Sequence, residues 1–383
     1  MRVMAKKAIL VLEDGSVYEG DAFGAEDNAY GEVVFNTSMT GYQEMLTDPS
    51  YAGQILVPTY PMIGNYGINE SDFESKQIQV RGFAVREYCS QPSHWQSTIT
   101  LHKFLQDNGI PGISGIDTRA LTRHIRSLGT MMGIITSKMT AEEALKELKN
   151  LPRYDSTDFV HQVTTEKPYD WQSDTSVTAN LPFLSLRGAS ATKQSRIAVI
   201  DYGLKYNILR ILSQFGCQVT AVPCTTSVED ILALNPDGIV LSSGPGNPTL
   251  LNDITEMVKK LAGKKPMMGI GLGQNVIGQA FGAENFKMKF GHRGSYPVRD
   301  LATGKVCITA QNHGYAIDAD TLKGGLEVSH VNLNDGTVEG LCHRDLPILS
   351  IQYHSEASPG PLDNRYLFAR FLEMVKGAKE QNA

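Results

Sequence analysis

The sequence predicts an α/β protein in two parts: an N-terminal domain of mixed strands and helices, followed by a domain whose mostly parallel sheet is covered by helices. From residue 196 onward, short apolar runs alternate with helical segments, which is typical of a parallel sheet with helices on both faces. Before residue 150, the chain shows short strands separated by turns rich in Gly, Asp and Asn. A length of 383 residues fits two domains, and a hydrophobic content of 41% supplies two cores.

The N-terminal domain is assigned to residues 1–150. Its first strand is expected at 8–12, because an apolar run there is too short for a signal peptide and ends at a charged turn. A second strand is expected at 31–36, and helices at 117–127 and 140–149. Thr140 followed three residues later by Glu143 predicts a capping box at the start of the last helix.

Residues 151–195 are rich in Ser, Thr, Asp and Ala and have no sustained periodicity. We interpret them as a linker that lies over a surface and adds no core element. The C-terminal domain is assigned to residues 196–383. Its expected strands and helices alternate in this order: strand 196–200, helix 205–216, strand 218–222, helix 227–234, strand 238–241, helix 252–262, and a strand that leads into a glycine-rich turn at 269–273.

Composition excludes several classes of function. The net charge is −6 and no basic run occurs, which argues against nucleic acid as the main partner. No apolar stretch reaches the roughly 18 residues that a membrane span requires. The five cysteines include no CxxC pair, so neither a disulfide framework nor a zinc site is indicated. We therefore expect a cytoplasmic protein with reduced thiols.

The most informative segment is residues 266–275, PMMGIGLGQN. An apolar strand, a glycine-rich turn and a helical run have the layout of a nucleophile elbow, in which a tight turn exposes one reactive side chain above a sheet. Gly271 occupies the apex and has no side chain, so the turn is retained while the nucleophile is missing. The alternative is a turn that only packs closely. A dinucleotide-binding GxGxxG fails because its third glycine position is Gln274.

His354 and Glu356 form a candidate base and orienting carboxylate. Alternate residues of an extended segment point to the same side, so the two side chains can hydrogen-bond as in a catalytic triad. The alternative is an ordinary surface histidine near a glutamate. The stiff segment 357–361, ASPGP, follows this pair directly and favours a built loop.

Two further loops are candidates for ligand binding. Residues 243–246, SGPG, let the backbone approach a ligand closely, although such loops are also common as plain tight turns. Residues 311–315, QNHGY, form a polar cluster suited to an amide or carboxylate. His292 and His313 belong to no set of His, Cys, Asp and Glu with ligand spacing, so no metal site is predicted.

Taken together, the C-terminal motifs resemble the class I glutamine amidotransferase (triad) domain. In that domain an elbow of the pattern Gly-Ile-Cys-Leu-Gly-x-Gln supplies a cysteine, and a later His-Pro-Glu supplies the base and its partner. The N-terminal blocks at 35–44 (FNTSMTGYQE), 46–51 (LTDPSY) and 115–119 (GIDTR) resemble the small subunit of carbamoyl-phosphate synthetase, as does 287–292 (KMKFGH). The resemblance covers nearly the whole chain.

The resemblance implies a small subunit that hydrolyses glutamine and passes ammonia to a large subunit. That large subunit would carry the ATP and metal sites and make carbamoyl phosphate for arginine and pyrimidines, so no cofactor is expected in this chain. The catalytic positions would be Gly271, His354 and Glu356. The glutamine-binding positions would be Ser50, Gly244, Gly246, Leu272, Asn275, Asn312, Gly314 and Tyr315.

Departures from the family pattern gather at this site. Gly271 replaces the cysteine, Asn275 replaces a glutamine, and Ser355 replaces the proline between His354 and Glu356. The loop at 295–297, SYP, is one residue shorter than the family form. Loss of a triad nucleophile can cost on the order of 10⁶ in turnover. Two hypotheses follow: a residual glutaminase that uses water with His354 as base, or a non-catalytic partner of a large subunit fed by free ammonia, with glutamine at most a vestigial ligand.

Overall fold

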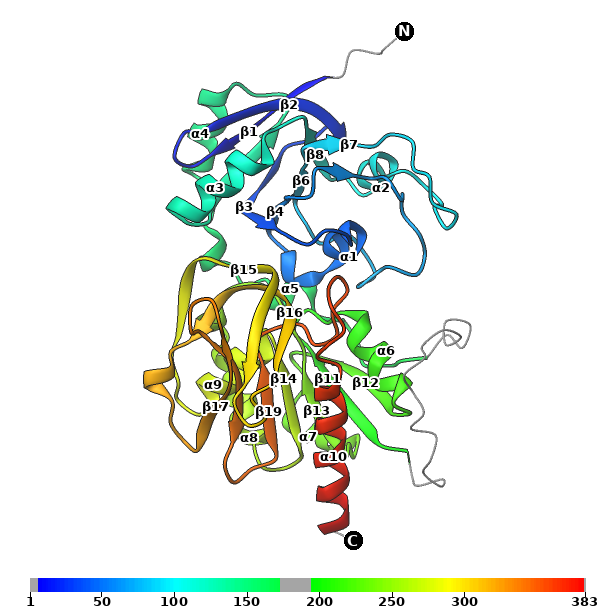
Figure 1. The fold of residues 1–383 in the computed structure, drawn as a ribbon, viewed down its shortest axis with the longest axis vertical. Coiled ribbons are helices and arrows are strands. Elements are labelled where there is room, and N and C mark those ends of the chain that lie inside the picture. Colours follow the sequence, from blue (N-terminus) through cyan, green and yellow to red (C-terminus); the bar gives the residue numbers. More distant parts are fainter. Residues whose placement is uncertain (1–5, 173–193, 382–383) are drawn as a thin grey trace.

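The computed structural model describes residues 6–172 and 194–381, which form two lobes stacked along the long axis (Figure 1). The upper lobe is a closed barrel with strand order β1-β2-β8-β6-β4-β3-β9. These strands are β1 (Lys7–Leu12), β2 (Val17–Gly24), β3 (Ala29–Asn36), β4 (Gln54–Pro58), β6 (Gly82–Ala84), β8 (Pro111–Ser114) and β9 (Met131–Thr136). The expected strands at 8–12 and 31–36 are present, whereas closure into a barrel depends on pairings between distant strands that local pattern does not encode.

Helices and short strands surround the barrel: α1 (Tyr42–Thr47), α2 (Leu101–Asp107), α3 (Thr118–Leu128), α4 (Ala141–Leu148), the 3-10 turn η1 (Pro49–Tyr51), and the pair β5 (Met62–Ile63) and β7 (Glu87–Tyr88). The predicted capping box is confirmed. The Thr140 side chain accepts from the Glu143 N–H, and the Glu143 carboxylate accepts from the Thr140 N–H at 2.8 Å.

The interpretation of residues 151–195 as a surface linker is wrong for part of its length. The segment contains η2 (Tyr154–Ser156), α5 (Val160–Val163) and β10 (Tyr169–Asp170), which pairs with the second lobe's sheet. Val160 is 1% exposed and belongs to that lobe's core, and a Cβ on Gly53 would lie only 2.3 Å from the ring of Phe159. Because single apolar residues, and not one continuous face, attach this segment to the core, its sequence shows no hydrophobic periodicity. Residues 173–193 of the predicted linker lie outside the described residues.

The lower lobe contains a ten-stranded sheet in the order β10-β12-β11-β13-β14-β19-β18-β17-β15-β16. Its parallel part consists of β11 (Arg196–Asp201), β12 (Gln218–Pro223), β13 (Gly238–Leu241), β14 (Met267–Ile270) and β19 (Ile348–Ile351). An antiparallel extension adds β18 (Val338–His343), β17 (Leu326–Asn332), β15 (Asn285–Asp300) and β16 (Val306–Ile317). The predicted α/β class is confirmed, and the sequence prediction missed the antiparallel part.

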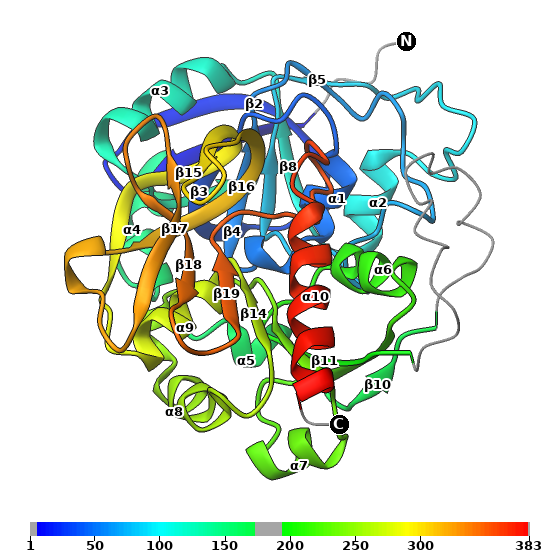
Figure 2. The same cartoon turned by 60° about the horizontal axis from the view of Figure 1, so that its bottom comes forward.

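Helices cover both faces of this sheet. One core packs under α7 (Val228–Ala233), α8 (Asn252–Leu261) and α9 (Leu272–Ala280), and the other under α6 (Tyr206–Gln214) and α10 (Tyr366–Gln381). Figure 2 shows α6 and α10 side by side over one face. Two short turns complete the lobe, η4 (Pro248–Leu250) and η5 (Ala319–Thr321). Among the described residues, no helix is both long and apolar enough to cross a membrane.

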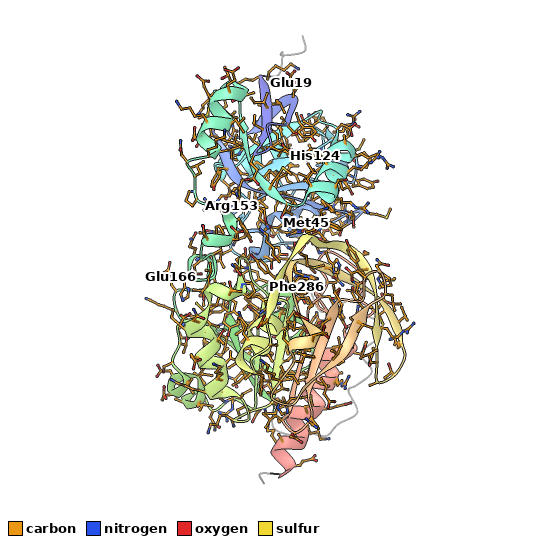
Figure 3. The ribbon with its side chains drawn as sticks, turned by 90° about the vertical axis from the view of Figure 1, so that its left-hand side faces the viewer. Glu19, Met45, His124, Arg153, Glu166 and Phe286 are labelled. Atoms are coloured by element: carbon orange, nitrogen blue, oxygen red, sulfur yellow. The ribbon has the colours of Figure 1, made fainter. Side chains whose placement is uncertain are left out.

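The two lobes meet where the long β15–β16 hairpin reaches the barrel (Figure 1). The Thr37 N–H donates to the Arg293 carbonyl at 3.3 Å, and the Thr130 N–H donates to the Lys289 carbonyl at 3.0 Å. Figure 3 shows Arg153 at the level of this junction, where its guanidinium bonds the Glu13 carboxylate of the barrel at 3.1 Å. The lobes are thus joined by backbone and side-chain contacts around a shared cavity.

Candidate active site

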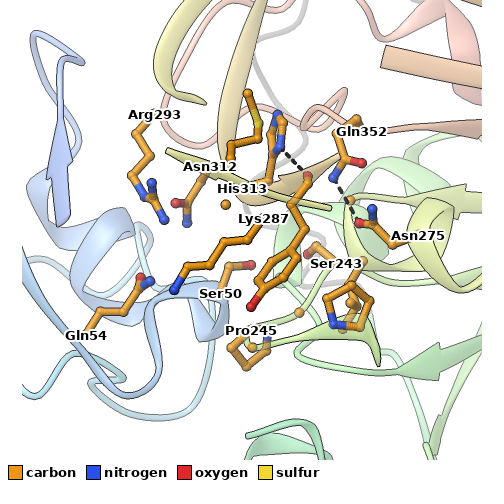
Figure 4. A pocket seen from close by; sticks show the side chains of 18 of the residues that line it. Ser50, Gln54, Ser243, Pro245, Asn275, Lys287, Arg293, Asn312, His313 and Gln352 are labelled. Atoms are coloured by element: carbon orange, nitrogen blue, oxygen red, sulfur yellow. Dashed lines mark hydrogen bonds between the residues drawn. The ribbon is translucent and has the colours of Figure 1, made fainter. Parts of the chain in front are cut away.

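A pocket lies between the two lobes and encloses about 590 Å³, counting the part open to solvent. Figure 4 shows side chains from both lobes converging on it. All but one of the predicted site residues line this pocket: Ser50, Gly244, Gly246, Gly271, Leu272, Asn275, Asn312, Gly314, Tyr315 and His354. The exception, Glu356, lies behind His354. The fold therefore brings together residues as far apart in the chain as Ser50 and His354.

The turn between β14 and α9 has the shape of a nucleophile elbow. Gly271 has φ 56° and ψ −114°, which glycine adopts without the penalty that a Cβ brings. The turn is held by hydrogen bonds from the Gly271 N–H to the Ile351 carbonyl at 2.8 Å and from the Gly273 N–H to the Ser242 carbonyl at 3.1 Å. A Cβ at position 271 would lie 3.3 Å from the Ser243 Cβ, so a small side chain fits with a slight adjustment. The turn keeps the backbone shape of an elbow, and the residue at its apex, Gly271, carries no side chain.

His354 and Glu356 form a buried hydrogen-bonded pair. The His354 Nδ1 lies 2.6 Å from a Glu356 carboxylate oxygen, and the two residues are 4% and 0% exposed. Because a carboxylate only accepts, Nδ1 carries the hydrogen and Nε2 is left for the pocket. Burial raises the pKa of Glu356, but the nearby His354 and Lys205 together with the hydrogen bonds to the carboxylate hold it below the usual range. Geometrically this is the predicted base with its orienting partner.

Two backbone N–H groups line the same space. Leu272 begins α9, so its N–H belongs to the first helical turn and has no partner within the helix. At Gly244 the backbone packs directly against the Tyr202 carbonyl group, since a Cβ on this residue would lie only 2.2 Å from the carbonyl oxygen. Neither N–H donates a hydrogen bond to another group in the described part of the chain. Donors of this kind can stabilise negative charge on a substrate oxygen.

Three buried donors in the pocket wall have no hydrogen-bond partner among the described residues: the Ser50 hydroxyl, the Arg293 Nε and the Asn312 amide nitrogen. Leaving a buried polar group unpaired costs about 1–3 kcal/mol. Three such donors around one cavity therefore indicate a ligand that carries acceptor oxygens. Figure 4 shows Arg293 and Asn312 adjacent, with Ser50 across the pocket from the other lobe.

Sequence reasoning missed several residues of this wall. Arg293 directly follows the block at 287–292, which the sequence analysis used to support the family resemblance but did not assign to the site. Lys287 crosses the mouth of the pocket to the Glu32 carboxylate at 3.0 Å, and Gln54 donates to the other oxygen of Glu32 at 2.9 Å. Nothing in the local sequence pairs residues 255 positions apart, so only the family blocks could have suggested them.

Asn275 lines the pocket, but its amide is already engaged. Its nitrogen donates to the Asn285 side chain at 2.7 Å, and its oxygen accepts from Gln352 at 3.2 Å (Figure 4). Gln274 in turn donates to Gln352 at 3.3 Å. At the position where the family pattern has a ligand-contacting glutamine, the side chain thus belongs to an internal chain of amides.

The sequence analysis found no metal ligands at the usual spacing along the chain, but the fold brings three candidate ligands together in space. Folding brings one nitrogen each from His292 and His313 and a carboxylate oxygen of Glu339 within 4.8 Å of one another, all three residues being buried. These residues are 47 positions apart at most and lie on β15, β16 and β18, so sequence spacing could not show their proximity.

The fold, the elbow and the His–Glu pair define an amidotransferase-like protein, and comparison with known families agrees. A model of the class I glutamine amidotransferase family matches residues 198–374, and one of the carbamoyl-phosphate synthase small chain, CPSase domain, matches residues 10–135. Similar proteins called carbamoyl phosphate synthase small chain occur in Akkermansia muciniphila (48% identity over 98% of this chain and 100% of that protein), Listeria monocytogenes (49%, 98% and 98%) and Syntrophotalea carbinolica (49%, 97% and 98%). The chain belongs to the carbamoyl-phosphate synthase small chain family.

Proposed function

We propose that this chain is the small subunit of a carbamoyl-phosphate synthase whose own glutaminase half-reaction is lost. It would join a large subunit that makes carbamoyl phosphate from bicarbonate, ATP and free ammonia, for arginine and pyrimidine synthesis in the cytoplasm. ATP and metal would bind that large subunit, while glutamine would be at most a vestigial ligand of this chain. Neither nucleic acid nor a membrane is expected as a partner.

The observation that carries the proposal is Gly271 at the apex of an otherwise intact elbow. Amide hydrolysis in a Cys–His–Glu site requires a thiolate to attack the amide carbon and form an acyl-enzyme, while the histidine donates a proton to the leaving ammonia. Here His354 and Glu356 are in place and the pocket is present, yet the atom that would form the covalent bond is missing. No cysteine replaces it, because none lines the pocket in the described part of the chain.

The proposal is tested with the complex of this chain and its large subunit. Carbamoyl phosphate synthesis is measured with ammonium chloride and with glutamine as alternative nitrogen sources, and glutamate release is followed in parallel. We expect full synthesis with ammonium and no glutamate release above a no-enzyme control. Glutamine-supported synthesis at a rate comparable to that with ammonium would contradict it, and would point to water attacking directly with His354 as base.

A further inference from the structure

Four buried side chains converge beside the pocket at the antiparallel end of the sheet. His292 on β15, His313 on β16 and Glu339 on β18 place their nearest nitrogen and oxygen atoms within 4.8 Å of one another. The Gln311 side-chain oxygen lies among them, 3.0 Å from the His292 Nδ1 and 2.8 Å from the His313 Nε2. Two imidazoles, a carboxylate and an amide oxygen are a donor set that suits zinc and related divalent metals.

Outer contacts orient both imidazoles toward this common point. The His292 Nε2 bonds the Asp335 carboxylate at 2.8 Å, and the His313 Nδ1 bonds the Tyr315 carbonyl at 2.8 Å. Both acceptors lack hydrogens, so each holds an N–H and fixes the tautomer. The remaining nitrogens, His292 Nδ1 and His313 Nε2, face the Gln311 oxygen, and the former also faces Glu339; each would bind a metal ion through its lone pair after losing any hydrogen it carries. A carboxylate or carbonyl behind a ligating histidine is the usual outer shell of a metal site.

Charge and hydrogen bonding in the cluster also favour a cation. Glu339 is 0% exposed, and one of its oxygens has no hydrogen-bond partner among the described residues. Its other oxygen accepts from Asn332 at 2.8 Å and lies 3.2 Å from the His292 Nδ1. The unpaired oxygen of this buried carboxylate is costly unless a further partner, such as a metal ion, contacts it. The amide oxygen of Gln311 adds a further acceptor to the same point.

We propose that His292, His313 and Glu339, with the Gln311 carbonyl oxygen, bind one divalent transition metal of the zinc class. Bonds of about 2.1 Å in a tetrahedron place ligand atoms roughly 3.4 Å apart, which side-chain rotation can reach from the present spacing. The ion would join β15, β16 and β18, and would fix His313, which also lines the inter-lobe pocket. Its role would be structural, and it does not depend on the loss of glutaminase activity.

The test uses the full chain, stripped with a chelator and titrated with zinc sulfate by isothermal calorimetry. We expect saturable binding of one equivalent, a visible absorption spectrum typical of a four-coordinate site when cobalt(II) replaces zinc, and a higher Tm for the zinc-loaded wild type than for the stripped protein. Asp335→Asn, which removes only an outer contact, should weaken zinc binding by about 10- to 100-fold. Glu339→Gln should abolish the zinc-dependent rise in Tm.

His94→Asn serves as the matched control, because His94 is exposed on the other lobe, and it should bind zinc as wild type does. If stripped wild type shows no saturable zinc binding and no zinc-dependent change in Tm, the proposal is wrong. In that case the hydrogen bonds between the two imidazoles and the Gln311 side chain hold the cluster together without a metal. Equal zinc affinity of the wild type and Glu339→Gln would overturn the assigned donor set.

Discussion

Replacing Gly271 by cysteine should restore glutamine hydrolysis. The position keeps the backbone of an elbow, with φ 56° and ψ −114°, and the base His354 is already hydrogen-bonded to Glu356 at 2.6 Å. The new Cβ meets only the Ser243 Cβ at 3.3 Å and atoms farther away, so its thiol can enter the pocket beside Leu272. The left-handed backbone that carries this side chain costs ~1–3 kcal/mol of stability.

The size of the gain follows from the missing parts. A triad nucleophile contributes on the order of 10⁶ in turnover, equivalent to ~8 kcal/mol of transition-state stabilisation. Asn275 offers its amide to Asn285 and Gln352 instead of a ligand, and one lost polar contact costs ~1–3 kcal/mol, or roughly 10- to 100-fold. Because Asn275 is present in both proteins, its cost lowers both rates and cancels in their ratio, so Gly271→Cys should hydrolyse glutamine up to about 10⁶-fold faster than wild type.

The assay is glutamate release by the complex with the large subunit, with Gly271→Ala as the matched control. Alanine imposes the same backbone strain without a thiol, so it should lower Tm as cysteine does and leave hydrolysis at the wild-type level. A second variant, Gly271→Cys with His354→Asn, should lose the gain. A Gly271→Cys variant that has a Tm like that of Gly271→Ala and yet releases no glutamate would contradict this prediction. The retained backbone would then not be sufficient for a competent site.

Three further predictions concern stability. Burial raises the pKa of Glu74 to about 7 despite two nearby cations, so the folded state binds this proton more tightly than the unfolded chain does. The free energy of unfolding should therefore fall by up to ~3 kcal/mol between pH 4.5 and 7 and then level off. Urea titrations should show a flatter pH profile for Glu74→Gln. Phe371→Ala, at 0% exposure in the core under α10, should cost ~3–5 kcal/mol in the same assay. Phe159→Ala removes the ring stacked on Tyr154 at 4.9 Å, and should speed proteolysis of the segment between the lobes with little change in the spectrum of the folded protein.

Local patterns were sufficient for the parallel strands β11 to β14, whereas the parallel strand β19 was not predicted. Each strand from β11 to β14 is a short apolar run, and each helix between them has a clear start or stop, so period and length decide the assignment. They were insufficient for β15, whose 16 residues alternate irregularly and carry a register shift between Lys287 and His292. They also gave no sign that β1 and β9 close the barrel, because that contact joins residues more than a hundred positions apart.

The site divides in the same way. The elbow and the pair His354–Glu356 are contiguous motifs, and sequence could propose them because their chemistry depends on neighbours in the chain. The unpaired donors on Arg293 and Asn312, and the ion pair of Lys287 with Glu32, arise from the packing of two lobes. Such features follow from tertiary structure, and only family resemblance could anticipate them from sequence.

His354 and Glu356 also take part in the packing of the structure. Glu356 lies 3.5 Å from the Lys205 ammonium group, and its backbone carbonyl accepts from the Asn207 side chain. The Asn207 N–H in turn donates to the Glu74 carboxylate of the other lobe at 3.0 Å. Removing Glu356 would leave the buried Lys205 without this countercharge, which is strongly destabilising. The pair His354–Glu356 is therefore packed against residues that contact the other lobe, and its presence alone is not evidence that the chain hydrolyses glutamine.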